Sequence, residues 1–188
     1  MHLPIELKRT TDGELSALYR DHMTRDFPSS ELKPLEMFRQ LIRDGLATVY
    51  LCLSDQQLVG YAALAAEPGG QAVLLDYLAV VPEQRGTGCG TAILQALQTM
   101  LKRPILIESE HPEAAQTPED RQIRTRRIHF YQQAGCRLTG RRVLLFGVDF
   151  DLLCLGGPLS PEEAVTAYAS LYQKMLPRER YQKKVILL

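Results

Sequence analysis

The chain has 188 residues, of which 45% are hydrophobic and 23% are charged, proportions typical of one globular domain with a substantial core. Because 22 Lys and Arg balance 22 Asp and Glu, no overall basic charge predicts a nucleic-acid partner. No leader-like segment or membrane-length apolar run is found, and the four cysteines lack metal-ligand spacing. We therefore expect a cytoplasmic protein with no membrane association and no bound metal.

Capping signals and hydrophobic periodicity predict a mixed α/β domain. Thr11 to Glu14 has the pattern of a capping box, Pro34 suits the start of a helix, and Gly45 suits its end. The run 72–81 is almost continuously apolar, as in a strand buried on both faces. The predicted elements are a helix after Thr11, a helix from Pro34 to Gly45, strands at 47–53, 58–65 and 72–81, a helix through 93–101, a strand at 105–108, a helix from 118 to about 134, strands at 142–146 and 148–155, and a helix from 161 to 176.

We expect one domain spanning 1–188, with a core at about 5–155 and a C-terminal helical extension at 156–188. The helix at 161–176 and the apolar tail at 185–188 would either cover the sheet or pair with another chain, so a monomer and a homodimer both remain open.

A glycine-rich loop joins the buried strand to the next helix. Residues 85–90 read RGTGCG, and glycines at this junction let backbone N–H groups approach an anion at the helix N-terminus. A Walker A loop is a poor match because no lysine follows the glycines. A dinucleotide fingerprint fails by one residue at Thr91, although Glu108 and Glu110 lie where its acidic residue would be.

Three segments in order resemble the GNAT acetyltransferase superfamily. The loop matches the pattern [Q/R]xxGx[G/A], the segment 75–82 (LDYLAVVP) resembles the central strand of that family, and 130–136 (FYQQAGC) resembles its FYxxxGF segment. The element order from about residue 5 to 150 also follows the family. The resemblance implies a GNAT fold with a splayed central sheet that binds acetyl-CoA as co-substrate. The implied coenzyme-binding residues are Leu78, Ala79, Val80, Arg85, Gly86, Thr87, Gly88, Cys89, Gly90 and Thr91.

Acetyl transfer to an amine requires a base for the ammonium proton and is helped by an acid for the departing thiolate. By resemblance, Tyr131 occupies the position of the general acid, and Glu108 that of the base. The alternatives are a packing aromatic at Tyr131 and a solvated strand-end carboxylate at Glu108. The polar segment 109–120 departs from the compact family pattern and makes the register of Glu108 less certain.

Three further residues are candidates for the acceptor site. Glu110 alternates onto the same sheet face as Glu108, Asp76 is a charge in an apolar run, and Arg124 lies seven residues before Tyr131 on one helical stripe. The functional hypothesis is an N-acetyltransferase acting on a primary amine of a small molecule or peptide. The alternative is a non-catalytic module that binds or senses acyl-CoA on the same scaffold, and a nucleotide-dependent enzyme is a third hypothesis.

Overall fold

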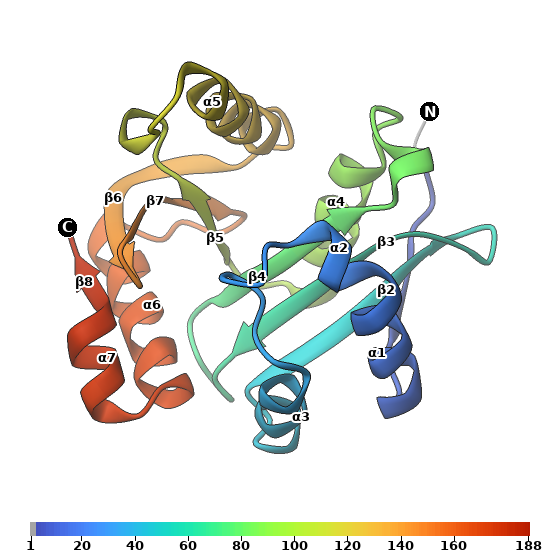
Figure 1. Ribbon diagram of the computed structural model, residues 1–188, viewed down its shortest axis with the longest axis horizontal. Coiled ribbons are helices and arrows are strands. Elements are labelled where there is room, and N and C mark those ends of the chain that lie inside the picture. The colour runs from blue at the N-terminus through green and yellow to red at the C-terminus, as the bar shows by residue number, and fades with distance from the viewer. Residues whose placement is uncertain (1–2) are drawn as a thin grey trace.

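The apolar runs of the sequence form the centre of one mixed sheet in the computed structural model, which describes residues 3–188 (Figure 1). The strand order is β1-β2-β3-β4-β5-β7-β6-β8, and only the β4–β5 pair is parallel. The strands are β1 (Glu6–Arg9), β2 (Ala47–Ser54), β3 (Gln57–Ala66), β4 (Val73–Val80), β5 (Ile105–Glu110), β6 (Arg137–Leu145), β7 (Val148–Leu155) and β8 (Val185–Leu187).

Helices cover both faces of this sheet. One face packs against α4 and α5, and the other against α6 and the N-terminal helices, so that β4 and β5 are buried from both sides. The helices are α1 (Asp12–Leu18), the π-helix η1 (Tyr19–Met23), α2 (Thr24–Asp26), α3 (Leu35–Arg43), α4 (Cys89–Leu101), α5 (Pro118–Gln133), α6 (Pro161–Met175) and α7 (Arg178–Lys184), with 3-10 turns η2 (Pro82–Gln84) and η3 (Pro112–Ala114). None of the helices between residues 3 and 188 is both long and apolar enough to cross a membrane.

The helix starts follow from their capping residues. Thr11 and Ser160 each form a complete capping box, and the Thr117 hydroxyl accepts the N–H of Asp120. All three starts confirm the sequence predictions.

One N-terminal strand was not predicted, and two predicted strands have other bounds in the structure. The strand β1, which the sequence did not predict, is short and partly polar. The strand β6 begins at Arg137 instead of Arg142. Arg137 and Leu138 already pair with β7, and an irregular stretch separates them from the pairs that begin at Arg142. The strand β5 extends to Glu110, so the segment predicted as a polar loop from 109 begins inside the sheet.

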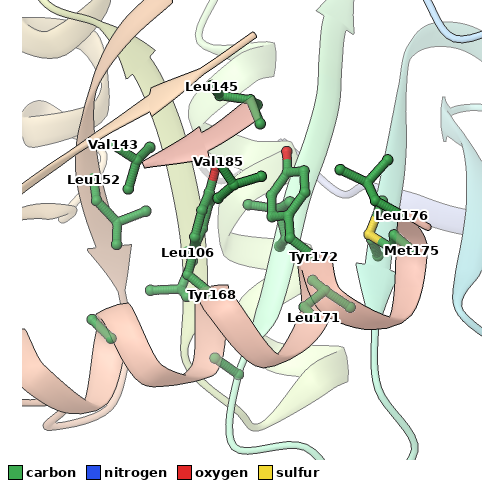
Figure 2. Close-up of a cluster of buried hydrophobic side chains, with 14 of the residues drawn as sticks. Leu106, Val143, Leu145, Leu152, Tyr168, Leu171, Tyr172, Met175, Leu176 and Val185 are labelled. Atoms are coloured by element: carbon green, nitrogen blue, oxygen red, sulfur yellow. The ribbon is translucent and has the colours of Figure 1, made fainter. Parts of the chain in front are cut away.

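The C-terminal extension is part of the sheet and of its core. The strand β8 pairs antiparallel with β6 at the sheet edge, and α6 lays its apolar side on the sheet (Figure 2). Tyr168 and Tyr172, on successive turns of α6, are buried beside Leu106 of β5. The extension therefore reaches the centre of the sheet.

Candidate active site

The sheet opens between β4 and β5 after a short parallel ladder. Leu75 and Ile107 are the last paired residues, and beyond them the two strands diverge (Figure 1). On its other side β4 pairs with β3, and Asp76 is the extra residue in a bulge between the Ala63–Tyr77 and Leu64–Leu75 pairs. The bulge turns β4 away from β5 and leaves its second half with an open edge.

Two of the predicted coenzyme-binding residues direct their backbone groups at this open edge. The Val81 N–H bonds to the carbonyl of Val59 on β3. Because backbone groups alternate along a strand, those of Leu78 and Val80 point the other way, into the opening. Ala79 has the opposite orientation and directs its backbone toward β3.

The glycine-rich loop lies at the end of β4 and presents consecutive free N–H groups. From Gly86 to Thr91, no backbone N–H makes a hydrogen bond of normal geometry to another described residue, and the first such bond runs from Ala92 to the Gly88 carbonyl. The first turn of α4 carries no acidic side chain. Six free donors and a helix N-terminus form a site suited to a pyrophosphate.

Glycines in this loop have separate structural reasons. Gly86 and Gly88 have φ angles of 78° and 89°, in the left-handed region that favours glycine. A Cβ on Gly90 would lie 2.9 Å from the Phe130 ring of α5. Gly90 thus lets α5 approach the first turn of α4. Cys89, the first residue of α4, is buried in the core. Before the helix, the Thr87 hydroxyl donates a hydrogen bond to the Gln84 carbonyl.

Arg85 acts as a bridge within the protein. Its Nε donates to the Val80 carbonyl at 3.0 Å, and its guanidinium contacts Asp26 Oδ1 at 3.0 Å. The other oxygen of Asp26 accepts the hydroxyl of Tyr61 at 2.8 Å. Arg85 therefore joins the start of the loop to the end of β4 and to α2, and this geometry favours a role in shaping the loop.

Asp76 forms a shielded ion pair at the opening. Both of its oxygens accept hydrogen bonds from Lys33 Nζ, at 2.7 and 2.9 Å, and the two side chains are 8% and 17% exposed. Lys33 belongs to the segment between α2 and α3, which is also fastened by Tyr77: this hydroxyl donates to the Glu31 carbonyl and accepts the Lys33 N–H. The segment 27–34 is thus tied to the sheet beside the opening.

Glu108 lies on β5, one residue beyond the last ladder pair. Its carboxylate accepts the Tyr172 hydroxyl at 2.7 Å. Burial raises the pKa of Glu108, and the negative charge of Asp76 raises it further, while the nearby tyrosine hydroxyls and Lys33 oppose the shift. A carboxylate with a raised pKa at the opening is suited to accept a proton.

Tyr131 of α5 lies on the opposite face of the sheet from Glu108. It is buried with Leu75 and Ile107, whereas Glu108 shares the face of Leu106 and α6. Burial raises the pKa of Tyr131 to about 12, so its hydroxyl is protonated at neutral pH. That hydroxyl makes no hydrogen bond to any residue in the described range, which leaves it available to a ligand.

The structure brings Glu110 and Arg124 together, but as partners of each other. Arg124 bonds to Glu110 at 3.0 Å and to Asp120 at 2.8 Å, and Arg127 bonds to the second oxygen of Glu110 at 2.9 Å. These ion pairs hold α5 against the end of β5, and they leave Glu110 less free than Glu108 to accept a proton.

Four residues of the site were not found from the sequence. Lys33 and Asp26 pair with groups 43 and 59 residues away. Tyr172 bonds to Glu108 from the C-terminal extension, and Tyr168 packs beside Tyr172. The charge of Asp76 in an apolar run was a signal that a partner exists, but nothing local identified Lys33.

No group of His, Cys, Asp and Glu side chains arranged to hold a metal occurs among residues 3–188.

Comparisons with known proteins agree with this geometry. A family model described as an acetyltransferase (GNAT) domain matches residues 45–135, from β2 to the end of α5. Among curated proteins, no sequence matches the chain significantly.

Solved structures share the fold at low sequence identity. A protein described as a GNAT-family acetyltransferase from Bacteroides thetaiotaomicron is 24% identical, with a TM-score of 0.69 over 92% of this chain and 95% of that one. An acetyltransferase from Bacillus subtilis, solved in complex with CoA, is 18% identical with a TM-score of 0.53, covering 83% and 99% of the two chains. The ribosomal-protein-alanine N-acetyltransferase from Brucella melitensis is 19% identical with a TM-score of 0.53, covering 79% and 98%. The family match spans the open strand, the glycine-rich loop and Tyr131, so this part of the chain is similar to a GNAT acetyltransferase domain.

Proposed function

We propose that the protein transfers the acetyl group of acetyl-CoA to a primary amine of a small molecule or peptide. The observation that carries this proposal is the open edge of β4, which runs from the bulge at Asp76 to a loop with six N–H donors that bond to no other described residue. A phosphate-bearing ligand held by the loop would have an extended arm along this edge. The complex of the Bacillus subtilis structure with CoA supports this choice of ligand.

The residues at the opening suit the two proton transfers of the reaction. Acetyl-CoA supplies the activated acetyl thioester. Glu108 would accept the ammonium proton on one face of the sheet, since its raised pKa makes it a stronger base than an exposed glutamate. Tyr131 would donate its proton to the departing sulfur on the other face. Backbone N–H groups at the open edge of β4, including that of Val80, would stabilise the developing oxyanion.

The acceptor would enter on the face that carries Glu108. On that face, the elements around Glu108 are the segment 27–34, the Lys33–Asp76 ion pair and helix α6. The neighbour that acetylates a ribosomal-protein alanine supports an amine acceptor as a class. It does not select between a peptide and a small molecule.

Isothermal titration with acetyl-CoA, with NADH and ATP as controls, tests the ligand. We expect micromolar binding of acetyl-CoA and none of the controls. Thiol release with a panel of small primary amines and peptide N-termini then tests catalysis. Tyr131→Phe and Glu108→Gln should keep acetyl-CoA binding and lose turnover.

Two results would count against the proposal in different ways. Failure of well-folded protein to bind acetyl-CoA would remove the coenzyme from the function altogether. Binding without turnover on any amine of the panel would favour a protein that binds or senses acyl-CoA without transferring the acyl group.

A further inference from the structure

Two tyrosines of the C-terminal extension surround the Glu108 carboxylate. The Tyr172 hydroxyl donates to Glu108 Oε1 at 2.7 Å, and the Tyr172 ring is 2% exposed. Its neighbour Tyr168 is fully buried, with ring centroids 4.6 Å apart. Figure 2 shows both side chains projecting from α6 with their hydroxyls at the ends remote from the helix. Helix α6 lies outside the residues matched by the family model.

The Tyr168 hydroxyl is buried and has no hydrogen-bond partner among the described residues. A buried hydroxyl without a partner is costly, so such groups in folded proteins usually have a reason. Burial raises the pKa of Tyr168, and the negative charge of nearby Glu108 raises it further. A small movement of either side chain would therefore give Glu108 a second donor.

Among residues 3–188, no cation bonds directly to Glu108. The charged groups that act on its pKa are Asp76 on β4 and Lys33 in the segment 27–34, and these two bond to each other. The strand β7 presents the apolar Leu152 beside Glu108. The ionised form of Glu108 therefore depends on the hydroxyls of α6 for hydrogen bonds.

We propose that Tyr172 is a positioning residue that keeps Glu108 ionised and fixed at the opening, and that Tyr168 acts as its second donor. This inference rests on the proposed role of Glu108 as the base. Burial disfavours the charged form of Glu108, which is the form that can accept the ammonium proton. A hydroxyl that donates to the carboxylate favours its charged form and also fixes which oxygen is free for the acceptor.

A direct test measures the ionisation of Glu108 without a known acceptor. Protein labelled with ¹³C at the glutamate side-chain carboxyls gives a resonance for Glu108, identified because it is missing from Glu108→Gln. We expect the midpoint of its pH titration to move upward in Tyr172→Phe and in Tyr168→Phe, and furthest in the double variant. Tyr181→Phe, the same change on α7 of the extension, should leave the midpoint unchanged.

Further measurements separate this proposal from a packing role. Tyr168→Phe keeps the buried ring, so a packing role alone predicts an unchanged Glu108 titration in this variant, whereas a donor role predicts that the titration moves. With any amine that the enzyme acetylates, the acid limb of the kcat/KM profile of Tyr172→Phe should move to higher pH, with acetyl-CoA affinity retained.

An unchanged Glu108 midpoint in Tyr172→Phe would overturn the positioning role, even if Glu108→Gln were inactive. Full activity of Glu108→Gln would instead overturn the proposed base, whatever the titration showed.

Discussion

Asp76 and Glu108 occupy equivalent positions on adjacent parallel strands, each one residue beyond the last pair of the β4–β5 ladder. In a continued ladder they would be direct neighbours. Two carboxylates so placed repel each other, and burial increases the repulsion. The chain separates their roles: Asp76 pairs with Lys33, and Glu108 bonds to a tyrosine hydroxyl. The parting of the strands and this division of partners occur at the same point of the sheet.

Lys33→Met should destabilise the protein strongly, because it leaves Asp76 shielded from water without its cation and close to Glu108. Removing one partner of a buried ion pair costs about 3 kcal/mol. Urea unfolding followed by circular dichroism measures the change. Lys174→Met is the matched control, because its ion pair with Glu67 is longer and its side chain is 58% exposed, so its loss should have little effect. Equal stability of the two variants would show that the Lys33–Asp76 pair is not a structural tie.

Adding Asp76→Leu to Lys33→Met should recover part of the lost stability, because the unpaired carboxylate is then gone. The same unfolding experiment measures the recovery. A double variant less stable than Lys33→Met would mean that Asp76 supports the bulge of β4 independently of Lys33.

Glu108 should make stability fall as pH rises above the ordinary glutamate pKa of 4.5. Burial raises the pKa of Glu108, so the folded chain binds this proton more tightly than the unfolded chain does. Between the unfolded and folded pKa values, the unfolded state loses its proton first and is favoured by rising pH. The free energy of unfolding of Glu108→Gln, relative to wild type, should therefore increase as the pH rises above the ordinary glutamate pKa of 4.5.

Glu36→Gln provides a comparison of opposite sign. The hydrogen bond from Arg43 lowers the pKa of Glu36, so its contribution is present above the ordinary pKa and is lost as pH falls. Glu36→Gln should become less stable than wild type as pH rises. Parallel curves for the two variants would contradict the assigned direction for Glu108.

Gly90→Ala should weaken acetyl-CoA binding by moving α5 away from the first turn of α4. The added Cβ would lie 2.9 Å from the Phe130 ring, and overpacking of this kind costs about 1–3 kcal/mol of stability. Calorimetry and thermal unfolding measure the two effects. Phe130→Leu in the same chain should restore part of both. Gly13→Ala, where no atom lies within 4 Å of the added group, should be harmless.

The parts of the fold predicted from the sequence are those with local signals. The capping box at Thr11, the apolar run of β4 and the glycine-rich loop each depend on residues close together in the chain. The GNAT resemblance then predicted the family, and the GNAT domain model that matches residues 45–135 supports this prediction.

The features of the fold and site that the sequence did not predict depend on contacts between distant segments of the chain. The ion pairs of Lys33 and Asp26 and the bond from Tyr172 to Glu108 span 43 to 64 residues. The strand β8 has only three residues and becomes a strand only because β6 offers an edge to pair with. The predicted acceptor residues Glu110 and Arg124 are charged and close to the opening, but only the structure shows that each neutralises the other.

Asp26→Asn should weaken acetyl-CoA binding about as much as Arg85→Gln does, although Asp26 lies on α2 and outside the glycine-rich loop. If Arg85 shapes the loop through its bonds to Asp26 and the Val80 carbonyl, either variant releases the same constraint. The double variant should then bind about as well as each single one, giving a large coupling in a double-mutant cycle measured by calorimetry. Arg20→Gln, which breaks an exposed pair with Asp21 on η1, is the control. A direct contact between Arg85 and the coenzyme phosphates would give a different result: Arg85→Gln alone would lose affinity and reduce its dependence on salt, and Asp26→Asn would bind at least as well as wild type because it removes a competing negative charge.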